Sequence, residues 1–231
     1  MGIKERKERE KEQRREHIIN ISERLFVKKD FDAITMDEIA REGELSKGAL
    51  YLSFKSKEEI FLNIIYKATA LLYDIYVDAV AKSDNPIFKL RGMGEGYIAF
   101  YDKYPEYFKL LNKIHNHKIN YSKPKAGTKE IGKKIIGKTS DIWKLSQTII
   151  EDGIKKGIFK KQTDPQEIAV SLWAMSTMFI GLLDHLKSYD HSHIKDIPFN
   201  KLDIKKLLII NGRRIIFSIL KNPPKDIESL K

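Results

Sequence analysis

Residues able to bind an anion gather in one short stretch of the chain, between positions 46 and 57. The helical period predicts one small, hydroxylic and basic helix face: Ser46, Lys47, Gly48, Ala49, Tyr51 and Ser53. Small residues let a backbone approach a partner closely, and hydroxyls, lysine and a helix N-terminus suit phosphate oxygens. Lys57 falls in the first turn of the next helix, where the helix dipole disfavours a cation, which favours a phosphate partner for it.

Other chemistries find little support in the residues. We recognise no set of nucleophile, base and orienting residue, so an enzyme is not expected. The segment Gly92-x-Gly94-x-Gly96 follows no strand and precedes no Gly-Lys-Ser/Thr, so it predicts a thin or bent helix segment and no phosphate loop. The chain has no cysteine. The pairs His115/His117 and His191/His193 lack the i,i+4 spacing of helical metal ligands, so neither a metal nor a cofactor is expected.

Two short helices and the start of a long one must position the candidate residues. Thr35 and Glu38 form a predicted capping box for the first helix, and the chain breaks at positions 41–44. Ser46 is a predicted N-cap for the second helix, and Ser56 opens a third with another capping box. This pattern is a helix-turn-helix followed by its support, or equally a plain helical hairpin with a solvated polar face.

From about residue 18 to 62 the sequence resembles the DNA-binding domain of TetR-family transcriptional regulators. The positions that carry the resemblance lie at fixed spacing: Leu25, Phe26, Phe31, Thr35, Ile39, Ala40, the run 46–51, Phe54, Lys57 and Glu58. The resemblance implies an all-α fold, with a three-helix DNA-binding domain at 1–55 and a ligand-binding and dimerisation domain at 56–231. It implies phosphate contacts from Thr35, Lys47, Tyr51 and Lys57, with Ser46, Gly48 and Ala49 nearest the bases.

The chain departs from the family pattern in three places. Asp30 stands where the family usually has Gly, and Ser53 where it often has His. In the turn, Gly43-Glu44-Leu45 replaces Ala-Gly-Val, so Glu44 is expected to be strained unless the glycine has moved one place to Gly43.

Charge and length bound the remaining possibilities. The chain has 231 residues and a net charge of +11, but residues 1–60 hold 14 basic and 14 acidic residues and are neutral. The excess lies in the C-terminal part, where a Lys-rich composition or an anionic partner would each explain it. The N-terminus is charged throughout, and the longest uncharged run has 16 residues, short of the roughly 20 that span a bilayer. We expect a soluble, cytoplasmic protein without a membrane partner.

The spacing of apolar and aromatic residues predicts the helices of the C-terminal part. Helices are expected at about 56–82, 86–103, 105–115, 128–156, 165–187 and 203–221, with Gly157 as a C-cap. In the resembled family the last two pair with their copies, which implies a dimer interface at Trp173, Phe179, Leu182, Leu208, Ile215 and Ile219. Aromatic residues suit an effector pocket or simply a core: Tyr73, Tyr76, Tyr97, Phe100, Tyr101, Tyr104, Phe108, Trp143, Trp173 and Met178.

The predicted function is a ligand-responsive transcriptional repressor. A homodimer is expected to bind a pseudo-palindromic operator and to leave it when a small hydrophobic or amphipathic effector binds. The alternative is a DNA-binding adaptor controlled by a protein partner, with no small-molecule ligand.

Overall fold

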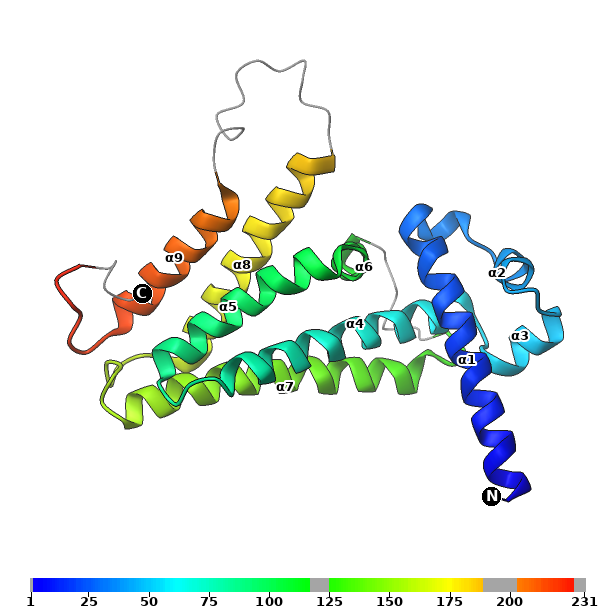
Figure 1. The fold of residues 1–231 in the computed structure, drawn as a ribbon, viewed down its shortest axis with the longest axis horizontal. Helices are drawn as coiled ribbons and strands as arrows, with labels where there is room; N and C mark the ends of the chain where they lie inside the picture. The colour runs from blue at the N-terminus through cyan, green and yellow to red at the C-terminus, as the bar shows by residue number, and fades with distance from the viewer. Residues whose placement is uncertain (1, 117–124, 189–202, 227–231) are drawn as a thin grey trace, which may run out of the picture. The chain divides into compact units, whose positions relative to one another are not determined.

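The computed structural model describes residues 2–116, 125–188 and 203–226, and the regular elements in these ranges are helices (Figure 1). They are α1 (Ile3–Lys28), the 3-10 turn η1 (Phe31–Ala33), α2 (Met36–Glu42), α3 (Lys47–Ser53), α4 (Lys57–Val80), α5 (Pro86–Lys103), α6 (Pro105–Asn116), α7 (Thr128–Lys155), α8 (Pro165–Ser188) and α9 (Ile204–Ile219). The predicted all-α fold is confirmed. Gly157 takes a φ of 69° just after α7, as its predicted capping role requires.

The chain divides into two compact units. The first comprises Met1–Leu71 and Pro105–Thr139, and the second Leu72–Tyr104 and Ser140–Lys231. Two helices, α4 and α7, therefore contribute residues to both units. This is a division by compactness, and the domain boundary expected between residues 55 and 56 stays a prediction.

In the first unit, α1 packs against α2, α3 and α6 (Figure 1). Three rings form the centre of its core, because Phe26, Phe31 and Phe61 lie with their centroids 5.1–5.6 Å apart. Leu50 and Phe54 are fully buried at i and i+4, as their spacing predicts. Burial of these apolar side chains holds the short helices α2 and α3, which are below the length at which isolated helices are stable.

The second unit has an apolar core cluster, and its helices α4 and α5 approach each other closely. The cluster includes Leu90, Ile150, Phe159 and Ile216. The glycines of α5 explain the thin segment expected there, since a Cβ at Gly92 would lie 3.2 Å from a backbone oxygen of α4. The predicted thin segment is therefore present at Gly92 and Gly96, where α4 occupies the space, whereas a Cβ at Gly94 would meet nothing within 4 Å.

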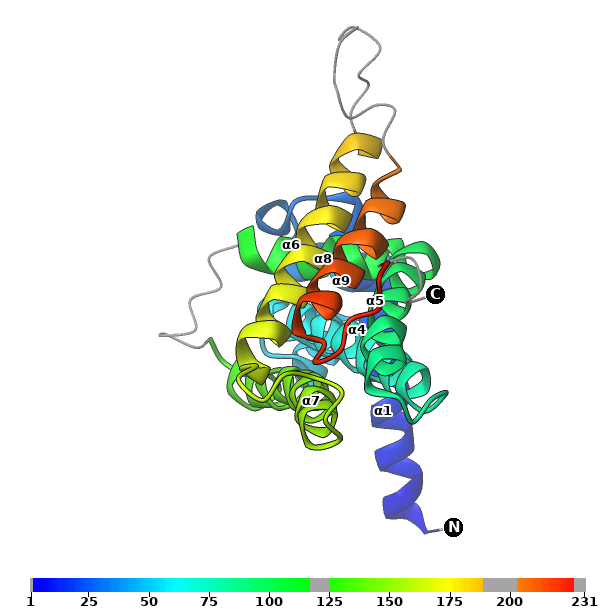
Figure 2. The same cartoon turned by 90° about the vertical axis from the view of Figure 1, so that its left-hand side faces the viewer.

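Helices α8 and α9 run side by side in both views (Figures 1 and 2). By length and composition, α4 and α8 are each apolar enough to cross a membrane. Half of the most apolar window of α4 is buried inside the structure, as for a core helix, but only 11% of that of α8 is buried. Most residues of α8 are only partly buried in the single chain, and Val170, Trp173 and Met178 are exposed on it.

Candidate nucleic-acid interface

Hydroxyl caps set the ends of the two short helices. The Thr35 hydroxyl accepts from the Glu38 N–H at 3.2 Å, and the Ser46 hydroxyl accepts from the Ala49 N–H at 3.2 Å. Both N-caps were predicted. The reciprocal half of the first capping box is not formed, because the Glu38 carboxylate pairs with the Lys29 ammonium, which lowers the pKa of that carboxyl.

The turn between α2 and α3 carries backbone strain. Glu44 has a φ of 51°, in the left-handed region that disfavours side chains with a Cβ, whereas Gly43 has a φ of −89°. The glycine has therefore not taken over the left-handed position, and the expected strain at Glu44 is present. Gly43 is needed for another reason, since a Cβ there would lie 3.2 Å from the Ile39 carbonyl oxygen.

Solvent reaches a continuous face of α3, which we call the outer face, made of Lys47, Gly48, Tyr51 and Leu52. The Lys47 ammonium lies 2.6 Å from the Asp37 carboxylate of α2, and this hydrogen bond raises the pKa of Lys47. Both side chains are well exposed, so the pair is open to exchange for another anion. Of the other predicted contacts, Thr35 and Ser46 are exposed and Ala49 is partly exposed.

The sequence grouped Ser53 with this face and overlooked Leu52. Ser53 is buried, and its hydroxyl donates to the Ala49 carbonyl at 3.1 Å, so its placement on the outer face was wrong. Leu52 is 71% exposed. The helical period contained this information, because a residue two places after the buried Leu50 lies about 200° around the helix. Leucine was overlooked because it is usually a core residue.

Lys57 has partners inside the protein. Its ammonium donates to the carbonyl oxygens of Phe31 and Ile34, each at 2.8 Å, and lies 3.4 Å from that of Asp32. It also lies 4.6 Å from the centroid of the Phe31 ring. The charge that the first turn of α4 disfavours is thus satisfied by backbone oxygens around η1. A phosphate contact from Lys57 stays a prediction, with these bonds as its competitor.

Arg15 of α1 is a positioning residue that sequence reasoning did not single out. Its guanidinium donates to the Ser53 carbonyl at the end of α3 and lies 4.0 Å over the Phe54 ring. It is also 3.8 Å from the Glu59 carboxylate, which accepts from the Lys55 N–H at 2.7 Å. Arg15 therefore joins α1 to the end of α3 and the start of α4. Its place in a charged run of α1 concealed this role.

The residues predicted to line an effector pocket have different environments. Tyr76, Tyr97, Phe100, Tyr101 and Phe108 are buried. Burial raises the pKa of Tyr76 and of Tyr97, and the nearby Thr177 hydroxyl partly offsets the shift at Tyr97.

The remaining members of that set lie closer to solvent. Tyr73, Tyr104 and Trp143 are partly buried, and the Trp143 ring lies 5.6 Å from that of Trp173. Trp173 and Met178 are 47% and 73% exposed. A single pocket lined by all ten residues stays a prediction.

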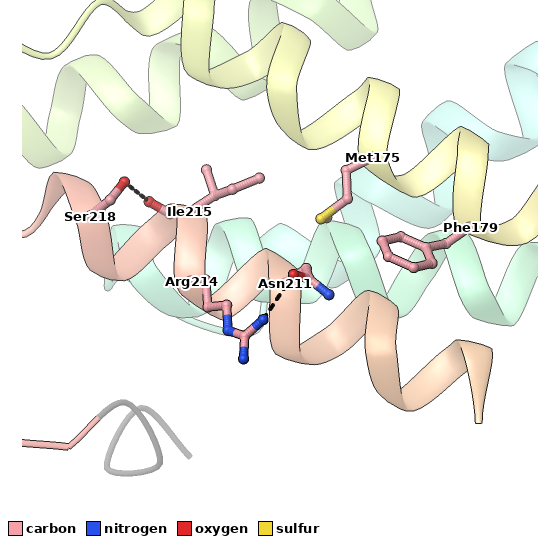
Figure 3. Close-up of a pocket in the computed structure, with 6 residues that line it drawn as sticks. All are labelled: Met175, Phe179, Asn211, Arg214, Ile215 and Ser218. Carbon is pink, nitrogen blue, oxygen red and sulfur yellow. Dashed lines mark hydrogen bonds between the residues drawn. The ribbon is translucent and has the colours of Figure 1, made fainter. Parts of the chain in front are cut away.

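A hollow of about 390 Å³ lies between α8 and α9, and Figure 3 shows the residues that line it. It is lined by Met175 and Phe179 of α8 and by Asn211, Arg214, Ile215 and Ser218 of α9. The Arg214 guanidinium donates to the Asn211 side-chain oxygen at 3.3 Å. None of these six residues belongs to the predicted pocket set, whereas Phe179 and Ile215 were predicted at a dimer interface.

The other predicted interface residues divide by burial. Trp173 is exposed and Leu182 partly exposed, but Leu208 and Ile219 are buried within the second unit. The histidine side chains at 115, 117, 191 and 193 lie outside the described part of the chain. Among the side chains that are described, no group of three or more His, Asp or Glu residues is placed to hold a metal ion.

Comparison with known proteins identifies the helix-turn-helix region. The family profile of bacterial regulatory proteins, tetR family, matches residues 18–64. An uncharacterized HTH-type transcriptional regulator of Bacillus subtilis, YerO, is 55% identical over 51 residues, which are 22% of this chain and 18% of YerO. The transposon Tn10 TetC protein of Escherichia coli is 30% identical over 83 residues, 36% of this chain and 42% of TetC. The matches thus span less than half the length of these relatives.

The likeness of fold extends further than the likeness of sequence. The structure of FadR from Bacillus subtilis in complex with stearoyl-CoA superposes with a TM-score of 0.67 at 14% identity, covering 88% of this chain and 98% of FadR. At that identity the superposition speaks for the fold alone. The match over the helix-turn-helix leads to one conclusion: residues 18–64 are a DNA-binding domain of the TetR family of transcriptional regulators.

Proposed function

We propose that this protein is a ligand-responsive transcriptional repressor that binds a two-fold symmetric DNA operator through α3. The observation that carries the proposal is the outer face of α3, where Lys47 and Tyr51 lie exposed beside a glycine with open space in front of it. Phosphate oxygens would replace Asp37 at the Lys47 ammonium. The family of the chain supports this use of the face.

A homodimer would supply the two recognition helices. Helix α8 supports this, because most of its residues are only partly buried, and Trp173 and Met178 are exposed on it. A second copy would cover the same surface through an isologous contact. The two α3 helices would then enter successive major grooves about 34–36 Å apart, as in other symmetric helix-turn-helix dimers.

We infer a hydrophobic or amphipathic effector that binds within the second unit. The buried phenols of Tyr76 and Tyr97 offer apolar surface with polar groups that fix orientation. The basic excess after residue 60 suits a negatively charged end on such a molecule. FadR, a structural relative, was solved with stearoyl-CoA, a molecule with both properties.

The two helices that belong to both units supply a route for coupling. At the start of α4 the Ser56 hydroxyl donates to the Ala126 carbonyl at 3.2 Å, and the buried Glu58 carboxylate pairs with Lys125, just before α7. The start of α7 is thus attached to the residues that follow the recognition helix. An effector that shifted α4 or α7 in the second unit would bias the position of α3, and DNA would bias effector binding equally.

Selection from a random-sequence DNA library tests the DNA-binding role. We expect enrichment of an inverted repeat by the wild-type protein and loss of enrichment by the double variant K47A/Y51A. A matched control is Val77→Ala, which removes an exposed side chain of α4 in the second unit and should leave selection intact. Absence of any enriched sequence with folded wild-type protein would contradict the proposal.

Native mass spectrometry of the purified protein tests the dimer and the effector. A dimer carrying a small molecule that denaturation releases would support both roles and identify the chemical class of the effector. A dimer without adduct, which also fails to release DNA on addition of acyl-CoA compounds, would favour control by a protein partner. A monomer at micromolar concentration would contradict the two-fold model.

A further inference from the structure

Leu52 is the unexplained residue of the recognition helix. It is 71% exposed, although the aliphatic and aromatic residues on either side of it, Leu50 and Phe54, are fully buried. A single exposed leucine is common on protein surfaces, so its exposure alone indicates nothing. Its position is informative, because it lies in the middle of the face proposed to meet DNA.

The outer face of α3 consists of two parallel rows of residues spaced i and i+4. One row holds the ammonium of Lys47 and the phenol of Tyr51, and the other holds Gly48 and Leu52. A Cβ at Gly48 would meet only the Ser46 hydroxyl oxygen, at 4.0 Å, so the space before this row is open. A partner can therefore approach the backbone at Gly48 and reach the Leu52 side chain beside it.

The two rows together specify the kind of partner. An apolar protein surface packed on this face would bury the Lys47 charge without an opposite charge, and burying an unpaired charge is costly. DNA presents phosphates beside the groove, for the row with Lys47, and base edges within the groove. Among the groups on the major-groove edges, the C5-methyl of thymine is the apolar one.

We propose that Leu52 is a specificity-determining residue that contacts a thymine methyl group in the operator, with Gly48 providing the clearance. The proposal rests on the function proposed above and adds a base preference to it. A thymine is selected at one position of each half-site because its methyl group and Leu52 bury each other. The operators should therefore contain an invariant thymine that a cytosine or a uracil does not replace.

A double-mutant cycle between protein and DNA measures this contact. Each thymine of the selected operator is replaced in turn by deoxyuridine, which removes only the methyl group. Wild-type protein should lose about fourfold in affinity per half-site at one position, the effect expected for exposing one buried methyl-sized group. Leu52→Ala should bind the thymine operator more weakly, yet show no further loss with deoxyuridine at that position.

Two controls keep the cycle interpretable. Ile136→Ala removes an aliphatic side chain of α7 that is 68% exposed in the same unit, and it should keep the full sensitivity to deoxyuridine. Leu52→Met preserves the apolar length of the side chain and should keep most of that sensitivity. Circular dichroism spectra that match the wild type would show that each variant is folded.

Three results would overturn the proposal. Sensitivity to deoxyuridine at the same position in Leu52→Ala would mean that another residue reads the methyl group. Full tolerance of deoxyuridine by the wild type would mean that no methyl group is read, while the regulator function would stand. Failure of the wild type to select any sequence would remove the regulator function as well.

Discussion

Replacing Lys57 with methionine distinguishes an internal role of this side chain from a role in phosphate binding. Methionine keeps most of the aliphatic stem and removes the ammonium. In the wild-type protein this ammonium donates to the carbonyl oxygens of Phe31 and Ile34 at 2.8 Å. Hydrogen bonds of a charged donor contribute about 1.5–3 kcal/mol each. Because Lys57 is partly exposed, we take the lower value for both bonds, about 3 kcal/mol in all.

One smaller effect opposes this loss. Removing a cation from the first turn of α4 relieves an unfavourable interaction with the helix dipole of about 0.3–1 kcal/mol. The expected net decrease in the free energy of unfolding is therefore about 2 kcal/mol. With a urea m-value of about 2 kcal/mol/M, the midpoint should fall by about 1 M.

Far-UV circular dichroism at a fixed protein concentration is the suitable assay. Tryptophan fluorescence would follow the wrong unit, since Trp143 and Trp173, the two tryptophans of the chain, both lie in the second. The matched control is Lys47→Met, which removes an exposed ammonium from the same domain. It should leave the unfolding midpoint unchanged and weaken binding to all DNA sequences. The salt slope of log K should fall by about 0.9 for each phosphate that the variant no longer neutralises.

The opposite pattern would refute this reasoning. If Lys57→Met kept the wild-type midpoint and reduced the salt slope as Lys47→Met does, the ammonium would leave the carbonyl oxygens for a phosphate. The role predicted for Lys57 from sequence would then hold.

Three further substitutions test other parts of the structure. Glu44→Gly should raise the free energy of unfolding by about 0.5–1 kcal/mol in urea titration, because glycine tolerates the φ of 51° that strains Glu44. Gly127→Ala should lower the free energy of unfolding by about 2 kcal/mol, because φ is 83° there and a Cβ would overlap the Glu59 carboxylate. The control Gly132→Ala should not lower it, because a Cβ within α7 at this position would meet nothing within 4 Å. Burial raises the pKa of Tyr76, so the unfolded chain loses this proton first and stability falls as pH rises above about 10. Tyr76→Phe should therefore show a smaller drop in urea midpoint between about pH 9 and about pH 11 than the wild type does, and an equal drop would contradict burial of the phenol.

Local patterns predicted much of the recognition domain. The caps at Thr35 and Ser46, the left-handed strain at Glu44 and the C-cap at Gly157 were all predicted from neighbouring residues. Each depends on hydrogen bonds or dihedral angles within about four positions along the chain, so residue type and spacing suffice to predict it.

Predictions that depended on distant partners fared differently. Glu38 was expected to bond back to Thr35, but α1 brings Lys29 to it instead, and η1 brings three carbonyl oxygens to Lys57. A long charged side chain reaches several alternative partners, and the packing of segments far apart in sequence selects among them. The aromatic residues expected around a pocket were likewise divided by packing into buried and exposed ones.

By itself, the sequence determined the all-α class, the helix-turn-helix and its family, because helical periodicity and capping chemistry are encoded locally. Only the tertiary structure decided how far the side chains of α3 are exposed, that Lys57 donates to carbonyl oxygens around η1, and that Arg15 joins α1 to the end of α3. The reason is physical: exposure and long-range hydrogen bonds are properties of the assembled core, which excludes water from some faces of each helix and leaves others to a partner.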